Sequence, residues 1–322
     1  MRIAHVSDLH VLSPPGAEWR RMLLNKRVTG LATLLFRRAR MYRAEYLAAV
    51  LDAAARRADH VVVTGDVTNL SLESEYGEAR RLLDEVARVT EVTVVPGNHD
   101  IYLREIVRER RFPHHFGRFV ESDLPDLALD LPAGRFPCVK LRGPAAFVAL
   151  SSAVPRPPFV SAGHIGQRQL QALQTILSRP EVAARTPVFL IHHGPIDSRF
   201  RLEQLRSGLV DAKAFRRAVS HVARGLVLFG HLHVRRRSRL STAAGALDVV
   251  CASGSSLDHP DDRIRAGFNL YTLDDRGAVA SIEAWVLDPA TLEFERHEIP
   301  TTRDELCLLG CGVLASSHRT QY

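Results

Sequence analysis

The sequence has few cysteines for its length, which excludes a fold held together mainly by disulfides. Among 322 residues there are only Cys138, Cys251, Cys307 and Cys311, whereas disulfide-rich secreted domains are far denser in cysteine. A metal site at the last two would need further ligands at suitable spacing. Because no signal-peptide pattern precedes the first strand-like run, we expect reduced thiols and a cytoplasmic location.

Long apolar runs, internal repeats and low-complexity segments are also missing. No stretch reaches the roughly eighteen apolar residues that are needed to span a bilayer. Hydrophobic residues make up 46% of the chain and charged residues 25%, which is typical of a globular protein with a sizeable core. We therefore expect one large domain over residues 1–300 and a C-terminal tail over 301–322.

One segment lacks acidic residues altogether, although the net charge of the whole chain is only +7. Residues 19–43 contain eight basic residues and no aspartate or glutamate. Leucine and valine recur among them at helical spacing, which predicts a helix with an apolar stripe flanked by arginines. Two interpretations stay open: a helix packed on the core, and a segment that lies at an anionic membrane surface.

Five strand-like runs each end in a cluster of aspartate, asparagine or histidine. The clusters are Asp8-Leu9-His10, Gly65-Asp66-Val67-Thr68-Asn69, Gly97-Asn98-His99-Asp100, His192-His193-Gly194-Pro195 and Gly230-His231-Leu232-His233. Strands alternate with helical segments such as 45–58 and 73–89, which predicts parallel strands with crossover helices. Because ligands bind at the carboxyl ends of such strands, we expect the clusters to lie together.

Two regions depart from this alternation. Residues 101–137 hold a basic amphipathic stretch followed by a segment rich in proline, aspartate and leucine, which we interpret as an insertion or cap near the site. From residue 247 onward, short β-like runs separated by Asp/Gly turns predict antiparallel strands. We expect a second sheet that is built partly from this C-terminal half.

The residues of the five clusters are of the types that bind hard or borderline cations. Asp8 and His10 are separated by one residue, as are His231 and His233, so on an extended segment each pair would point the same way. A lone histidine is more often a core or surface residue than a ligand. Five clusters support one another, because buried carboxylates and imidazoles without a cation would be costly.

The order and spelling of the clusters resemble the calcineurin-like metallophosphoesterases, whose five motifs match from residue 3 to about residue 234. The resemblance implies an α/β fold of four layers, α/β/β/α, in which two mixed β-sheets are flanked by helices. It also implies two metal ions held by seven residues. One ion would be bound by Asp8, His10 and His233, the other by Asn98, His192 and His231, and both by Asp66.

The same resemblance gives roles to three further residues. His99 would protonate the leaving oxygen, Asp100 would orient the ring of His99, and Asn69 would support the bridging loop. Gly194 departs from the family pattern, in which a proline commonly follows the paired histidines. We expect only a local change in loop stiffness from this difference.

The chemistry that follows is a hypothesis about phosphate esters. Two cations would share a hydroxide that attacks a phosphodiester or phosphoanhydride in line, and they would offset the charge of the phosphate oxygens. A ligand set of oxygen and nitrogen atoms without thiolate suits manganese, iron or zinc. Magnesium alone is disfavoured, because imidazoles are poor partners for it.

Fold and metals do not identify the substrate. The motifs at 97–100 and 230–233 look like those of bacterial small-molecule phosphodiesterases, including enzymes for cyclic AMP. The basic and apolar segment favours instead a lipid-linked substrate such as UDP-2,3-diacylglucosamine, hydrolysed by a peripheral protein at the inner membrane. Its candidate substrate contacts are Arg20, Arg21, Arg37 and Arg38.

Two other functions fit the sequence less well. A nuclease could use the basic runs at 104–111 and 235–239 as phosphate contacts. However, no basic groove interleaved with aromatic residues supports binding of nucleic acid. A non-catalytic protein-binding scaffold is disfavoured because all seven expected metal ligands are present.

Overall fold

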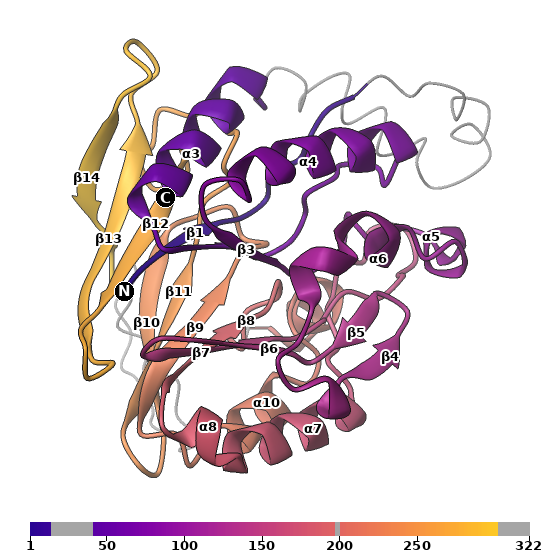
Figure 1. Cartoon of the computed structure of the whole chain (residues 1–322). Coiled ribbons are helices and arrows are strands. Elements are labelled where there is room, and N and C mark those ends of the chain that lie inside the picture. Colours follow the sequence, from indigo (N-terminus) through magenta and orange to yellow (C-terminus); the bar gives the residue numbers. More distant parts are fainter. Residues whose placement is uncertain (14–40, 197–199, 302–322) are drawn as a thin grey trace.

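The computed structural model describes residues 1–13, 41–196 and 200–301. Two six-stranded β-sheets form the centre of the molecule. Helices cover the outer face of each sheet, so the layers run helix, sheet, sheet, helix (Figure 1). This architecture confirms the expected α/β fold of two mixed sheets flanked by helices.

The first sheet has the strand order β14-β13-β12-β1-β2-β3. Its strands are β1 (Arg2–Val6), β2 (His60–Val63), β3 (Glu91–Val94), β12 (Gly267–Leu273), β13 (Val279–Leu287) and β14 (Phe294–Glu298). β1, β2 and β3 are parallel, and β12 pairs with β1 in the antiparallel sense. The crossovers are the helices α3 (Ala44–Arg57) and α4 (Glu73–Val86), close to the two predicted helices.

The second sheet has the order β10-β11-β9-β8-β7-β6. Its strands are β6 (Cys138–Arg142), β7 (Ala145–Ala149), β8 (Thr186–Leu190), β9 (Arg224–Phe229), β10 (Arg236–Ser241) and β11 (Ala246–Cys251). β7, β8 and β9 are parallel, as expected from the alternation of strand and helix. The helices α7 (Gln167–Ser178), α8 (Pro180–Ala183) and α10 (Ala212–Ala218) cover the outer face (Figure 1).

The C-terminal strands are divided between the sheets in a way that their sequence does not reveal. Of the four strands expected there, β11 joins the second sheet, in parallel with β9, whereas β12, β13 and β14 extend the first sheet through β1. β10 was not predicted as a strand, because its alternating arginines read as a basic run. Each strand's pairing depends on partners far away in sequence, which local patterns do not specify.

The side-chain alternation of the central strands builds two apolar layers. In β7, Phe147 belongs to the larger cluster between the two sheets, whereas Val148 belongs to the smaller cluster beneath α7 and α10. Strands that are buried on both faces read as continuous apolar runs, which is why the sequence revealed them so clearly. The central strands are therefore packed on both faces, which fixes the positions of their carboxyl ends and of the loops that follow.

Residues 101–137 fold against the first sheet and α4. They form α5 (Arg104–Arg108), α6 (Arg111–Phe116), the 3-10 turns η3 (Gly117–Val120) and η4 (Pro125–Leu127), and the hairpin β4 (Leu129–Leu131) and β5 (Gly134–Phe136). Phe112, Phe116 and Phe136 are fully buried in the larger apolar cluster. The expected insertion thus contributes to the main core.

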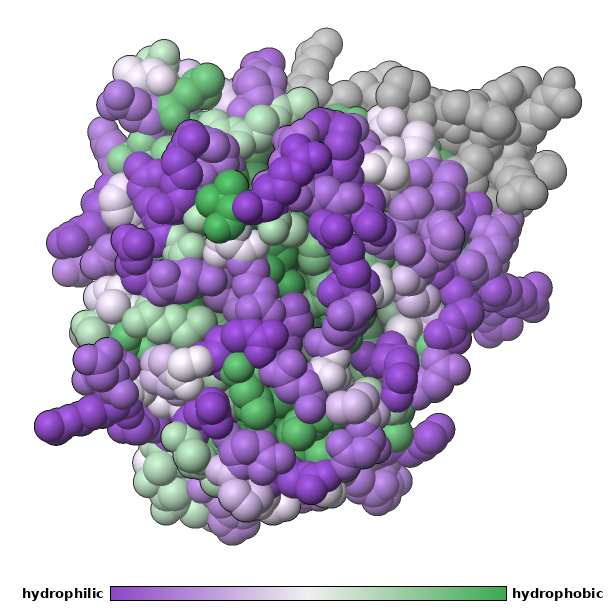
Figure 2. Space-filling model, viewed as in Figure 1, coloured by the Kyte–Doolittle hydropathy of each residue, from purple (hydrophilic) through white to green (hydrophobic). Residues whose placement is uncertain are grey.

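None of the described helices is both long and apolar enough to cross a membrane. The face in Figure 2 is mostly hydrophilic, with apolar atoms exposed in small groups. The segment 19–43, apart from residues 41–43, lies outside the described residues, and so do its candidate contacts Arg20, Arg21, Arg37 and Arg38. Residues 302–322 of the expected tail lie outside them too.

Candidate functional site

The five clusters follow the carboxyl ends of strands in both sheets, and their loops are tied together by backbone hydrogen bonds. The amide of Asp8, after β1, donates to the carbonyl of Gly65, after β2 (2.9 Å). In the second sheet, the amide of Gly230, after β9, donates to the carbonyl of His192, after β8 (3.1 Å). The sheets thereby bring residues from across more than two hundred positions into one site.

The first group of expected ligands converges around Asp8. Nε2 of His233 lies 3.2 Å from Oδ1 of Asp8 and 3.3 Å from Nε2 of His10. The candidate ligand atoms of Asp8, His10, Asp66 and His233 all lie within 4.8 Å of one another. Four donor atoms of the types that bind borderline cations therefore face one small volume.

The second group lies on the other side of Asp66. Nε2 of His192 is 3.1 Å from Oδ1 of Asn98 and 3.4 Å from Oδ2 of Asp66. The ring of His231 stands nearly perpendicular to that of His192, with 5.1 Å between centroids. Oδ2 of Asp66 is also 4.0 Å from Nε2 of His10, so this one oxygen atom lies between the two groups.

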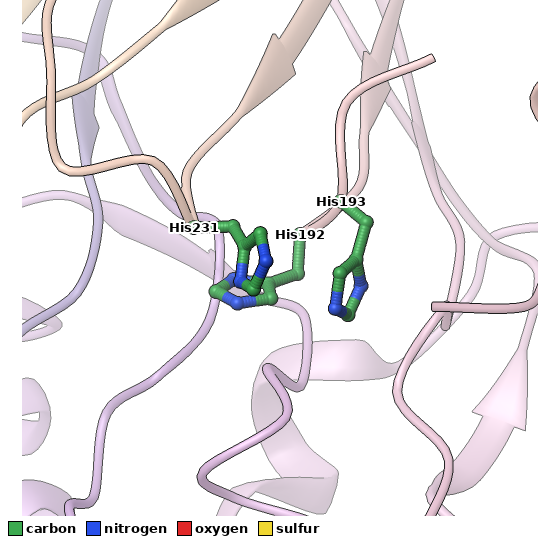
Figure 3. Close-up of side chains that lie close together, drawn as sticks. All are labelled: His192, His193 and His231. Carbon is green, nitrogen blue, oxygen red and sulfur yellow. The ribbon is translucent and has the colours of Figure 1, made fainter. Parts of the chain in front are cut away.

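His193 lies close enough to His192 and His231 to count as a third metal ligand by distance alone (Figure 3). However, both of its ring nitrogens have other partners. Nε2–H donates to the carbonyl of Ser161 (2.7 Å), and Nδ1 accepts from the hydroxyl of Ser152 (2.8 Å). A neutral ring in this arrangement has no lone pair left for a metal, which favours Asn98 as the third ligand of this group.

Hydrogen bonds fix which ring nitrogen of the other two histidines can face a metal. Nδ1–H of His192 donates to the carbonyl of Thr64 (2.7 Å), which leaves Nε2 directed at Asp66. Nε2–H of His231 donates to the carbonyl of Ser207 (2.8 Å), which leaves Nδ1. Metal-binding histidines usually hold their second nitrogen on a carbonyl or carboxylate in this way.

The charges of the site are unbalanced without a cation. Asp8 and Asp66 are buried, and although burial opposes their ionisation, His233 and His192 respectively hold their pKa well below the usual range. Burial would lower the pKa of His192, but the charge of Asp66 outweighs it and raises that pKa to about 9. In the absence of metal, a proton on His192 therefore compensates the negative charge of Asp66, and a bound metal ion would replace that proton.

His231 and His10 are poised as neutral ligands. Burial lowers the pKa of His231 to about 4 and holds the pKa of His10 well below its ordinary value. Within the described part of the chain, Oδ1 of Asp8 and Nδ1 of His10 are buried without a hydrogen-bond partner. Because unpaired buried polar atoms are costly, the cluster fits a cation, which would satisfy the orphaned carboxylate oxygen.

The backbone of the site corrects one expectation. The paired residues Asp8/His10 and His231/His233 are not extended, because their φ angles are 50°, 44°, 69° and 54°. Asp66, at 51°, also adopts this left-handed conformation, which costs a residue with a side chain about 1–2 kcal/mol. The side chains converge because the backbone turns between them, and such strain concentrates at functional sites.

Two glycines leave room for this arrangement. A Cβ atom at Gly97 would lie 2.1 Å from Oδ1 of Asp66, so the loop after β3 can approach Asp66 only without a side chain. A Cβ atom at Gly194 would lie 2.4 Å from the ring of Phe229. Gly194, which departs from the family pattern, therefore leaves room for the ring of Phe229, in addition to the expected change in loop stiffness.

The surroundings of His99 correct the expected role of Asp100. The carboxylate of Asp100 accepts from the amide of Gly97 (2.8 Å) and from the amide and hydroxyl of Thr68 (2.8 and 2.9 Å). The ring of His99 is oriented instead through Nδ1–H, which donates to the carbonyl of Asn69 (2.5 Å). Asp100 thus ties two loops together, and Asn69 supports His99 through its backbone.

Sequence reasoning missed two aromatic residues at the site. The ring of Tyr42 lies 4.9 Å from that of His10, and the ring of Tyr102 stacks on His99 with centroids 5.6 Å apart and planes 13° apart. Tyr102 follows the third cluster by two residues, so its position next to a motif was a usable signal. Tyr42 gave no such signal, since it lies thirty-two positions from His10 in the sequence.

Two arginines of the nuclease interpretation are engaged elsewhere. Arg235 is fully buried, and its Nη1 donates to the carbonyls of Asp262 and Arg265. Arg111 is also buried and donates to the carbonyl of Ser71. These two side chains stabilise loops and are not available to contact a polyanion, whereas Arg104, Arg108 and Arg239 of the same runs are exposed.

Comparisons with known proteins agree with this geometry. The model of the calcineurin-like phosphoesterase family matches residues 1–235, and no curated protein matches the chain. A dimetal phosphatase from Danio rerio is 15% identical with a TM-score of 0.51, over 85% of this chain and 92% of that chain. A purple acid phosphatase from yellow lupin (Lupinus luteus) seeds is 12% identical with a TM-score of 0.55, over 100% of this chain and 57% of that chain.

At such identities, the solved structures show a shared fold and no more. The family model is stronger evidence, because it spans most of the chain and includes all five clusters. The protein therefore belongs to the calcineurin-like phosphoesterase family.

Proposed function

We propose that this protein hydrolyses a phosphodiester or phosphoanhydride at a dinuclear metal centre, with Asp66 as the bridging ligand. Family membership implies a metal-dependent phosphoesterase. The observation that carries the finer proposal is the position of Oδ2 of Asp66, 3.4 Å from His192 and 4.0 Å from His10. One carboxylate oxygen between two groups of ligands suits a shared pair of cations.

The proposed ligands are the seven expected residues. Asp8, His10 and His233 would hold one cation, Asn98, His192 and His231 the other, and Asp66 both. When bound, such ions activate water and neutralise phosphate oxygens. The oxygen and nitrogen donor set supports manganese, iron or zinc as the native metal.

His99 would act on the leaving group. Its amide donates to Oδ1 of Asp66 (2.7 Å), which fixes its backbone beside the bridging ligand. Since Nδ1–H is held on the carbonyl of Asn69, Nε2 is the atom that would deliver a proton to the departing oxygen. Asn69 and Tyr102 would hold the ring in position for that transfer.

The substrate class is the least constrained part of the proposal. A small diester, cyclic AMP included, needs only the metal centre and His99. The basic and apolar segment 19–43 supports the alternative of an acylated substrate such as UDP-2,3-diacylglucosamine, bound by a cytoplasmic protein at the membrane surface. Arg20, Arg21, Arg37 and Arg38 would then contact the diphosphate.

A substrate panel tests both levels of the proposal. Purified protein would be loaded with Mn²⁺ and assayed with bis-p-nitrophenyl phosphate, cyclic AMP and UDP-2,3-diacylglucosamine. Activity on none of these phosphoesters, with metal bound, would contradict the hydrolase. A variant with Arg20, Arg21, Arg37 and Arg38 changed to glutamine should lose activity on the acylated substrate only, and equal loss on all substrates would contradict the assigned contacts.

A further inference from the structure

Large exposed apolar side chains are unevenly distributed over the described residues. Of nine such residues, five come from two adjoining segments, 157–162 and 200–210. These five, which we call the α9 patch after the helix α9 (Arg201–Ser207), are Phe159, Phe200, Leu202, Leu205 and Val210. A sixth, Leu232, lies between the expected ligands His231 and His233. Contiguous apolar surface of this kind marks an interaction site.

The two segments form one surface because their backbones are hydrogen-bonded. The amide of Ser161 donates to the carbonyl of Arg206 (2.8 Å), and the amide of Gly163 donates to the carbonyl of Gly208 (3.0 Å). Nε of Arg206 also donates to the carbonyl of Phe159 (3.2 Å). Leu202 and Leu205 are three residues apart on α9, so they share one face of the helix.

The side chains of the patch protrude into solvent. Phe159 is 76% exposed and Leu202 78% exposed, and none of the seven residues of α9 is buried. Phe159 also has a φ angle of 66°, an unfavourable conformation for an aromatic residue. Small-molecule sites are concave and enclose their ligand, whereas a protruding apolar surface needs a partner that can surround it.

The patch adjoins the metal centre. The carbonyl of Ser207, at the end of α9, accepts from Nε2–H of His231, and the carbonyl of Ser161 accepts from Nε2–H of His193. One segment of the patch is thus attached to His231, a proposed ligand, and the other to His193, whose ring lies 4.5 Å from that of His231. A partner that covers the patch would therefore lie near the proposed metal centre.

We propose that the α9 patch docks on an anionic lipid surface. The phenylalanines and leucines would enter the boundary between headgroups and acyl chains, as the apolar side chains of interfacial helices do. Within the two segments, two arginines, Arg201 and Arg206, stand against one acidic residue, Glu203, while Arg156 adjoins the first segment and Asp211 adjoins the second. The excess of positive charge complements anionic headgroups. The inference rests on the proposed function in that docking would bring the metal centre to phosphoesters held in the membrane.

Vesicle cosedimentation tests the docking independently of catalysis. Wild-type protein should bind vesicles of phosphatidylcholine that contain phosphatidylglycerol more tightly than vesicles of phosphatidylcholine alone. The Leu202→Ser/Leu205→Ser variant should bind the anionic vesicles at least about tenfold more weakly than the wild type. Arg201→Gln should weaken binding to the anionic vesicles and leave binding to phosphatidylcholine alone unchanged. Val89→Ser, which changes another exposed apolar residue (63% exposed), is the matched control and should bind like the wild type.

The remaining outcomes separate this proposal from its alternatives. Equal vesicle binding by the wild type and the double leucine variant would overturn it, and so would a wild-type dimer that the leucine changes convert to a monomer. Turnover of soluble bis-p-nitrophenyl phosphate should be the same in both proteins. If neither turns over any phosphoester while vesicle binding still depends on the leucines, the proposed hydrolase fails and the docking surface stands.

Discussion

The backbone carbonyl of Asn69 lies 2.5 Å from Nδ1 of His99 and determines which nitrogen of that ring carries its proton. A carbonyl oxygen accepts only, so Nδ1 must be protonated. The hydroxyl of Ser71 donates to the carbonyl of His99, and the ring of Tyr102 stacks on its imidazole. His99 is therefore held from three sides, and Nε2 is the atom that would deliver a proton in the proposed mechanism.

Replacing the ring of His99 should slow hydrolysis most for substrates with poor leaving groups. We expect His99→Gln to lower turnover of an alkyl phosphodiester by about 100-fold or more, because general acid catalysis contributes about 10²–10⁴-fold. Turnover of bis-p-nitrophenyl phosphate, whose leaving group needs little protonation, should fall much less. Rates for a series of leaving groups would measure this. An equal loss across the series would contradict proton donation, and the exposed His114→Gln is the control.

Loss of the bridging carboxylate should release metal. Removing even an outer partner of a metal ligand costs 10–100-fold in affinity or activity, so Asp66→Ala should reduce turnover by at least about 100-fold. Elemental analysis of purified protein should show fewer than two ions per chain. Asp84→Asn, which removes a carboxylate paired with Arg80 on α4, should keep both ions. Full turnover in Asp66→Ala would refute the bridging role.

Removal of metal from the wild type should lower its thermal stability. Ligands that bind only the folded state stabilise it by about 2.7 kcal/mol at a hundredfold excess over Kd. With an unfolding entropy of about 2.1 cal/mol/K per residue, that corresponds to a fall of about 4 °C for a chain of this size. Differential scanning calorimetry with and without a chelator would detect it. Adding Mn²⁺, Fe²⁺ or Zn²⁺ should restore the transition better than Mg²⁺, and an unchanged transition would argue against a resident metal.

Acid should destabilise the protein through His60, which is remote from the metal centre. Its ring is buried, stacks on Phe147 at 4.1 Å, and lies 2.8 Å from the hydroxyl of Thr93. Burial, followed by the charge of Lys140, lowers the pKa of His60 to about 3. Between pH 6.5 and that value the unfolded chain binds a proton that the folded chain does not, so stability falls as the pH falls.

One such proton changes the free energy of unfolding by up to about 1.4 kcal/mol per pH unit. His60→Gln should flatten the dependence by that amount below pH 6, as measured by urea unfolding at several pH values. His114→Gln again serves as the control and should keep the wild-type slope. A slope unchanged by His60→Gln would show that this ring does not contribute.

The sequence predicted the strands and the ligands for different physical reasons. Strands such as β7 and β8 were clear in the sequence because both of their faces are buried. The proposed ligands were clear because their clusters follow directly after strands of this kind. The division of β11 and β12 between two sheets depends on pairing with β9 and β1, which no local pattern encodes. The true partner of Asp100 was missed for a similar reason, since Thr68 lies thirty-two residues away.

Each group of proposed ligands takes side chains from both sheets. Asp8 and His10 follow a strand of the first sheet and meet His233 from the second, while His192 from the second sheet meets Asp66 from the first. Two bound ions would therefore cross-link the two halves of the fold, because each would be coordinated by residues from both sheets. The halves could not slide or part without breaking coordination bonds, so catalytic competence and the mechanical integrity of the domain would be lost together.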